Sequence, residues 1–200
     1  MPGHAISDMS ETKTCPELTP FALRPLHSAT YPLDDFYAVR RLPLPVMDQI
    51  EPDQIPEPYR SLLVHDGDMT SRLEAFHKGK IHIRALARNH HGREYFREVV
   101  LELDGSLQPV EFGATKVNLD FFPVKAHQEI RREQRPLGGI LHDFHIPFTS
   151  RPGAWFRLTA DSFIGGALRL TGAPLLFGRR NTLLDASERA MAEIVEILPP

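Results

Sequence analysis

The sequence predicts an α+β domain built on an antiparallel sheet, and three stretches of the chain carry that prediction. Residues 93–103 (REYFREVVLEL) and 108–119 (QPVEFGATKVNL) both have the character of strands, and they flank Asp104-Gly105, a dipeptide favoured in tight hairpin turns. Residues 80–89 (KIHIRALARN) alternate apolar and polar side chains, as a half-solvated antiparallel strand does. Strands joined by a tight turn pair antiparallel, so the sheet is predicted to be antiparallel.

The N-terminal 58 residues are rich in proline, which leaves little room for long regular elements. We expect residues 1–21 to be disordered and residues 22–200 to form a single domain, with the proline-rich segment as an extended arm. The apolar side chains between Tyr31 and Val46 are expected to pack against the rest of that domain.

Helices are predicted on either side of the three strands. Residues 59–76 favour a short apolar helix, a turn at Asp66-Gly67-Asp68 and a second helix that Asp68 or Thr70 caps. Residues 124–135 favour a solvated helix that ends before Pro136, and residues 136–144 favour a turn into a helix or a strand. Residues 147–178 mix Gly and Pro with short apolar runs and predict no definite element.

The C-terminal segment carries conflicting local signals. Asp185 and Glu188 have the spacing of a capping box at the start of a helix. Alternatively, residues 180–184 and 190–198 are strands around a turn at residues 185–189. In that hairpin Ala192, Ile194 and Glu196 share one face.

Composition excludes several classes of protein. A hydrophobic fraction of 42%, a charged fraction of 24% and the lack of a long apolar run are typical of a globular protein without a membrane span. A formal net charge of −3 argues against a nucleic-acid-binding surface. The single Cys15 excludes an internal disulfide. The N-terminus has neither a signal nor a transit pattern, so a cytoplasmic protein is expected.

Arg97 is the residue that most needs an explanation. Strand alternation places it on the same face as Val99, Leu101 and Leu103, three aliphatic residues that are expected to be buried. A buried guanidinium needs an anion, because an unpaired buried charge costs several kcal/mol. That anion is either a ligand or a protein carboxylate such as Glu111 or Glu196. In a third interpretation, the alternation of buried and exposed residues is shifted by one position, and Arg97 faces solvent.

Other polar motifs predict no site. His142 and His145 have a spacing that a helix could turn toward one metal ion, but a third ligand is missing, so no metal site is predicted. Neither a phosphate-binding glycine loop in a strand-to-helix setting nor a serine nucleophile elbow is present. No cofactor is expected.

Four segments taken in order resemble the chorismate lyase family, whose members convert chorismate to 4-hydroxybenzoate and pyruvate. They are LLVHDGDMTSRLE (62–74), FREVVLELDG (96–105), PLGGIL (136–141) and FGRRNTLL with EIVEILPP (177–184 and 193–200). The resemblance implies a chorismate lyase-like or UTRA-like fold, in which a curved antiparallel sheet has helices on one face and an internal ligand cavity. It also implies a hairpin, not a helix, at the C-terminus.

The resemblance also implies roles for individual residues. Arg97 falls on the arginine that binds the substrate carboxylate, and Glu196 falls on the buried catalytic glutamate. Met69 and Leu137 fall on pocket walls, and Gly113 falls on a glycine close to the bound ring.

The chain departs from the family between PLG and GRR, where it is longer. An alternative alignment places residues 170–178 on the last hairpin and Arg179 at the position of the glutamate. In the preferred alignment, Arg179 and Arg180 either draw a dianionic substrate to the pocket mouth or pair with Asp185 and Glu188 on the surface.

The predicted function is therefore that of a carbon–oxygen lyase acting on chorismate or a similar carboxylated ring. Arg97 would hold the ring carboxylate in a bidentate ion pair. Burial would raise the pKa of Glu196, which would donate a proton to the departing ether oxygen or only orient the substrate. The alternatives are a non-catalytic domain that binds a small aromatic acid and a biosynthetic tailoring enzyme that reuses the cavity. The oligomeric state is not predicted.

Overall fold

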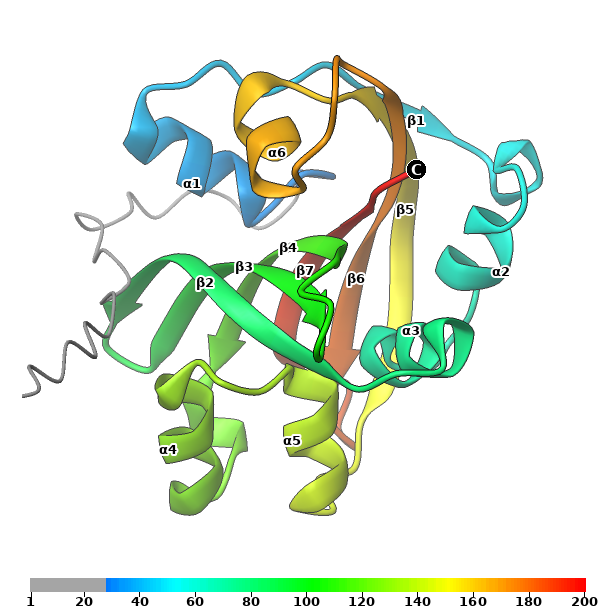
Figure 1. Cartoon of the computed structure of the whole chain (residues 1–200). Helices are drawn as coiled ribbons and strands as arrows, with labels where there is room; N and C mark the ends of the chain where they lie inside the picture. Colours follow the sequence, from blue (N-terminus) through cyan, green and yellow to red (C-terminus); the bar gives the residue numbers. More distant parts are fainter. Residues whose placement is uncertain (1–27) are drawn as a thin grey trace, which may run out of the picture.

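The computed structural model describes residues 28–200 (Figure 1). The helices are α1 (Leu33–Arg40), α2 (Tyr59–Leu63), α3 (Met69–His77), α4 (Val124–Arg132), α5 (Leu137–Asp143) and α6 (Ser162–Ala167), with short 3-10 helices at Pro52–Gln54 and Leu119–Phe121. The strands are β1 (Met47–Ile50), β2 (Ile81–His91), β3 (Glu94–Leu103), β4 (Pro109–Asn118), β5 (Thr149–Thr159), β6 (Leu175–Leu184) and β7 (Ala190–Leu198). The expected disorder of residues 1–21 lies outside the described residues.

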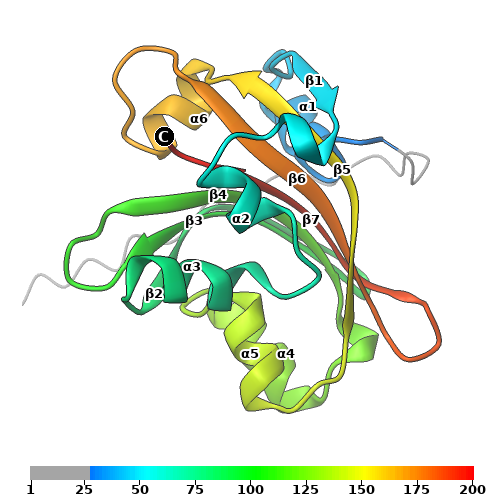
Figure 2. The same ribbon diagram turned by 90° about the vertical axis from the view of Figure 1, so that its right-hand side faces the viewer.

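All seven strands form one antiparallel sheet in the order β1-β5-β6-β7-β4-β3-β2. The sheet is strongly twisted, so that β5 and β6 cross at a steep angle to β2 and β3 (Figure 2). The predicted α+β fold with a curved antiparallel sheet is confirmed.

Helices cover both faces of the sheet, so the prediction that they lie on one face is wrong. On the face that carries Val99 and Leu101, the apolar side chains of α2, α3, α4 and α5 pack against the strands. The opposite face is covered by α1 and α6 (Figure 1). Helix α1 belongs to the proline-rich segment, where only an extended arm was predicted. Phe36 and Tyr37 of α1 are buried as expected, whereas Val46, later in the same segment, is 82% exposed.

The β3–β4 hairpin follows the predicted alternation. Val99 and Leu101 belong to the core beneath α2 and α3, whereas Phe96 and Val100 belong to the core beneath α1 and α6. Both faces of β3 are therefore buried, and the predicted common face of Arg97, Val99 and Leu101 lies in the interior.

Strand β2 departs from the predicted alternation after Ala85. The register between β2 and β3 shifts between Ala85 and Ala87, and such a bulge moves the following side chains to the opposite faces. Ala87 is therefore buried under α1 and α6 rather than on the face of Ile83. Arg88, predicted to point to solvent, lies opposite Arg97 and on the same face.

The C-terminal segment is the β6–β7 hairpin, so the local helix signal is wrong and the alternative strand interpretation is confirmed. Asp185 still caps backbone N–H groups, since its side chain accepts hydrogen bonds from the nitrogens of Ser187 (2.9 Å) and Arg189 (2.8 Å). These groups belong to the hairpin turn instead of a helix, and Asp favours both settings for the same chemical reason.

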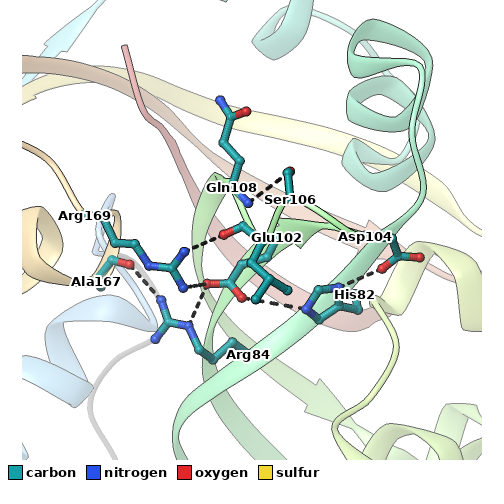
Figure 3. Close-up of polar contacts among 9 residues, drawn as sticks. His82, Arg84, Glu102, Asp104, Ser106, Gln108, Ala167 and Arg169 are labelled. Atoms are coloured by element: carbon teal, nitrogen blue, oxygen red, sulfur yellow. Dashed lines mark hydrogen bonds and ion pairs between the residues drawn. The ribbon is translucent and has the colours of Figure 1, made fainter.

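A buried glutamate attaches α6 and the loop after it to the sheet (Figure 3). Glu102 is only 3% exposed and receives Arg84 Nε and an Arg169 nitrogen, each at 2.7 Å. Arg84 also donates to the carbonyl of Ala167 at 2.8 Å, and His82 lies 3.7 Å from the second oxygen of Glu102. These contacts hold the end of α6 and the loop after it on the face opposite that of Arg97.

A second buried glutamate on this face, Glu98, holds α1. Arg40 at the end of α1 forms an ion pair with Glu98 and lies 4.4 Å from the ring centre of Phe163. The Tyr37 hydroxyl donates to Asp161, the N-cap of α6, at 2.8 Å. The pKa of Glu98 is raised from 4.5 to about 7, because burial and the carboxylate of Asp161 raise it more than Arg40 lowers it.

The raised pKa of Glu98 makes the stability contribution of this residue dependent on pH. Between about pH 4.5 and 7 the folded state retains a proton that the unfolded state has released, so this contribution to the free energy of unfolding falls as the pH rises. Glu98→Gln removes the titration. We expect the free energy of unfolding of the wild type, minus that of the variant, to fall by on the order of 2–3 kcal/mol between about pH 5 and pH 8. Chemical denaturation at each pH measures both values. Parallel pH profiles would contradict this account.

No helix among residues 28–200 is long and apolar enough to cross a bilayer.

Candidate ligand-binding site

A cavity lies between the sheet and the first turns of α3 and α5. Its volume is about 50 Å³, which is room for on the order of four water molecules. An apolar cavity of about 150 Å³ holds benzene, so a single-ring acid fits here only when the cover of the cavity moves outward. The lining residues are Asp68, Met69, Thr70, Ile83, Arg97, Val99, Leu101, Glu111, Thr115, Pro136, Leu137, Gly138, Asn181, Leu183, Ile194 and Glu196.

Arg97 lines this cavity and is 2% exposed. Among the described residues, its guanidinium has one hydrogen-bond partner, the carbonyl of Arg135, which NH1 reaches at 3.5 Å. The Nε–H has no partner. Burial lowers the pKa of Arg97, while Tyr95 and Glu133 raise it. The predicted ion pairs with Glu111 and Glu196 are not formed, so the cation faces the cavity without a carboxylate bound to it.

Glu196 also lines the cavity, but it is held by Arg179. The two residues face each other across β6 and β7, and Arg179 Nε donates to a Glu196 carboxylate oxygen. Arg179 is fully buried, and its NH1 donates to the carbonyls of Leu63 (3.2 Å) and His65 (3.0 Å). Both interpretations of Arg179 are therefore wrong: it is neither at a pocket mouth nor paired with Asp185 or Glu188. Arg180 pairs with Glu193 at 3.0 Å.

Glu111 is the cavity residue whose role the sequence did not predict. It is 4% exposed, and its Oε2 has no hydrogen-bond partner. Burial and the neighbouring Glu196 raise the pKa of Glu111 well above 4.5, whereas Arg179 lowers it. The signal available in the sequence was strand alternation, because Glu111 precedes Gly113 by two residues and so shares its face.

Gly113 on β4 lies next to two side chains that line the cavity. A Cβ at this position would lie 3.1 Å from Glu111 Oε1 and 3.5 Å from Val99 Cγ2, two side chains that line the cavity. A larger residue here would therefore occupy space beside Glu111. Gly113 itself is not among the residues that line the cavity, and its predicted position beside a bound ring stays a prediction.

Helices α3 and α5 form the cover of the cavity. Met69 and Leu137 are the first residues of these helices and both line the cavity, as expected for pocket walls. Asp68 caps α3 through the Ser71 nitrogen (2.8 Å) and accepts a hydrogen bond from His142 of α5 at 2.9 Å. The helices also approach closely at Gly138, where a Cβ would lie 2.4 Å from an Asp68 oxygen.

His142 is thus explained by its contact with Asp68. Within residues 28–200, no three His, Cys, Asp or Glu side chains are grouped closely enough to hold a metal ion.

Comparison with solved structures finds this architecture in PhnF from Mycobacterium smegmatis, with a TM-score of 0.51 and 16% identity. The match covers 66% of this chain and 63% of PhnF, so this chain spans less than two thirds of that protein. The fold is chorismate lyase-like.

Weaker similarity extends to two other structures. The product of gene SA0254 from Staphylococcus aureus has a TM-score of 0.49 and 8% identity, over 60% of this chain and 82% of that one. The ligand-binding domain of a Bordetella bronchiseptica protein assigned to the GntR family of transcriptional regulators has a TM-score of 0.40 and 12% identity, over 53% and 67%. No protein-family model and no curated protein matches the sequence.

Proposed function

We propose that this chain binds a small monocarboxylic acid in the cavity under α3 and α5, with Arg97 as the anchor of the carboxylate. The observation that carries the proposal is the unpartnered Nε–H of this fully buried guanidinium. A charge taken out of water is tolerated when an anion and hydrogen bonds compensate it. A ligand carboxylate in the cavity supplies both, because a guanidinium binds carboxylate in a bidentate pair.

The other charged groups that line the cavity already have partners or are neutral. Glu196 is bound by Arg179, and Asp68 is bound by His142 and by the first turn of α3. Burial and the charge of Glu196 raise the pKa of Glu111, which favours the neutral form of its carboxyl. Among residues 28–200, Arg97 is therefore the one cation that lines the cavity, which favours a ligand with a single carboxylate. The volume of about 50 Å³ favours a compact ligand as well.

Calorimetric titration and thermal unfolding of the full chain test this proposal. Benzoate is expected to bind and to raise the melting temperature, and benzamide, which has the same shape without the charge, is expected to do neither. Arg97→Met should lose benzoate binding. Arg93→Met is the matched control, because Arg93 is exposed and pairs with Asp120 at 3.0 Å on the surface. Equal effects of benzoate and benzamide, or undiminished binding by Arg97→Met, would overturn the proposal.

A second candidate function is the elimination of pyruvate from chorismate, to which the sequence motifs point. The observation that favours it is the buried carboxyl of Glu111 next to Glu196, because burial and the charge of Glu196 favour its neutral form, which can donate a proton to a departing ether oxygen. Chorismate has two carboxylates and is larger than benzoate, which is why binding of a monocarboxylate is the preferred proposal.

Release of pyruvate, coupled to lactate dehydrogenase, separates the two candidates. A lyase is expected to turn over chorismate and to lose activity on Arg97→Met. Binding of benzoate without pyruvate release would exclude the lyase function and leave the binding function intact.

A further inference from the structure

A second pocket lies outside the cavity, where the ends of β2 and β3 meet α4. Its volume is about 170 Å³, and its lining residues are Arg88, Asn89, His90, Tyr95 and Arg131. None of these residues lines the cavity under α3 and α5. This basic pocket is therefore separate from the site that we propose for a carboxylate.

The bulge in β2 directs two basic side chains into the basic pocket. Beyond the bulge, Arg88 lies opposite Arg97, and His90 lies opposite Tyr95. Residues directly opposite one another in antiparallel strands share a face of the sheet. A strand without the bulge would place both basic side chains on the other face. The bulge thus brings Arg88 and His90 to the face that α4 covers, where Arg131 meets them.

Positive groups outnumber negative groups around this pocket. Arg131 NH2 lies 3.1 Å from His90 Nε2, and among residues 28–200 neither side chain forms an ion pair with a carboxylate. Glu133 is the acidic neighbour. It lies 3.5 Å from Arg88 NH1 and accepts a hydrogen bond from the Tyr95 hydroxyl. Its carboxylate therefore compensates Arg88, whereas Arg131 and His90 are left without an anion.

The contact between Arg131 and His90 indicates what the pocket lacks. A guanidinium only donates hydrogen bonds, so the imidazole accepts through Nε2 in its neutral form. Protonation of the imidazole would bring two positive groups into contact, which is unfavourable. An oxyanion between the two side chains would accept a hydrogen bond from each and remove this conflict.

The arrangement of the donors favours a tetrahedral anion. Arg88 and His90 enter from β2, and Arg131 enters from α4 on the other side. The several oxygens of a phosphate or sulfate group can accept from donors on both sides, whereas a carboxylate offers two oxygens in one plane.

The pocket also has room for more than the anion. Its volume of about 170 Å³ exceeds the roughly 150 Å³ of a cavity that holds benzene. The rings of His90 and Tyr95, whose centres are 6.3 Å apart, offer flat apolar surface to an organic group attached to the anion.

We infer that the basic pocket binds the phosphate or sulfate group of a small molecule, with Arg88, His90 and Arg131 as the donors. Glu133 stays bound to Tyr95 and keeps the fold of the surrounding segment. The inference is independent of carboxylate binding by Arg97, because the two sites share no lining residue.

The test is titration of the full-length protein at constant ionic strength with phenyl phosphate, inorganic phosphate and phenol. Calorimetry measures affinity, and nuclear magnetic resonance follows the ring signals of His90. Phenyl phosphate is expected to bind in a saturable manner and to shift these signals, and phenol, which lacks the charge, should do neither. Tighter binding of phenyl phosphate than of inorganic phosphate assigns a phosphate ester as ligand, and equal binding assigns the free anion. Both results support the site.

Arg131→Gln and His90→Gln are each expected to weaken binding of phenyl phosphate about tenfold, the value of one charge-assisted hydrogen bond. Both residues are exposed, so neither change disturbs the core, and thermal unfolding verifies this. Arg132→Gln is the matched control. Arg132 is the next residue of the same helix, is 61% exposed and pairs with Glu129 outside the pocket, so its loss changes the net charge equally. Binding by this variant should equal that of the wild type.

Two results would overturn the inference. Absence of saturable binding by the wild type would show that the pocket does not select an oxyanion. Equal weakening by Arg131→Gln and Arg132→Gln would show that the anion responds only to the overall charge of α4. Neither result bears on carboxylate binding, which Arg97→Met tests.

Discussion

Arg97→Met is expected to make the protein more stable in the absence of ligand, and insensitive to carboxylates. The guanidinium is buried without a carboxylate partner and with an unbonded Nε–H. Methionine fills a similar elongated volume among Val99 and Leu101 without the cost of burying a charge. We expect the free energy of unfolding, measured by urea denaturation, to rise by about 1–3 kcal/mol.

Arg97→Lys provides the control for this prediction. It keeps the positive charge in the same surroundings, so it should not stabilise the protein, and it loses the planar fork that matches a carboxylate. If Arg97→Met destabilised the protein more than Arg97→Lys, the arginine would be serving the fold, and its availability to a ligand would be refuted.

Arg179→Met is expected to have the largest destabilising effect. It removes the partner of Glu196 and the donor to two backbone carbonyls, and it leaves a buried carboxylate next to Glu111. Loss of one member of a buried pair costs about 3–5 kcal/mol. The double variant Arg179→Met with Glu196→Leu removes both charges, and we expect it to recover most of that loss.

A double-mutant cycle measures the coupling between the two residues. The surface pair of Arg151 and Glu188, with side chains 58% and 75% exposed, is the matched comparison and should show a coupling energy below about 1 kcal/mol. A coupling energy equally small for Arg179 and Glu196 would mean that Arg179 does not neutralise Glu196. The charges assigned to the cavity residues would then be wrong.

The elements that the sequence predicted well are those specified by local pattern. Asp104-Gly105 identified the β3–β4 hairpin, and strand alternation then placed Arg97 in the interior. Asp68 was named as a candidate cap of the helix at residues 69–77, and its side chain does cap α3. Each of these features depends on residues that are close together in the chain.

Features that depend on distant residues were beyond the sequence. The bulge in β2 reverses the faces of Ala87 and Arg88 without any Gly or Pro that would signal it. Helix α1 is stabilised by contacts with α6, which lies more than 120 residues later in the chain. In the C-terminal segment, tertiary pairing of β7 with β4 and β6 overrides the local helix signal, and the hairpin was predicted only through the family resemblance.

The candidate site shows the same division. Alternation and the family resemblance together selected Arg97, Glu196, Met69 and Leu137, which all line one cavity. Neither source indicated that Arg179 neutralises Glu196, because that contact depends on the register of the last hairpin. Because Arg179 binds Glu196, Glu111 is left without an ion-pair partner among the described residues. This could be recognised only from the structure.

The most direct test of the central claim is a nuclear magnetic resonance titration that reads the Arg97 Nε–H group itself. The signal of this group is assigned in isotope-labelled protein by its loss in Arg97→Lys. Addition of benzoate is predicted to shift the signal in a saturable manner and to slow its exchange with water, as expected when a carboxylate binds a buried guanidinium. A signal that stays unchanged while benzoate binds, or that reports an existing ion pair within the protein, would contradict the account.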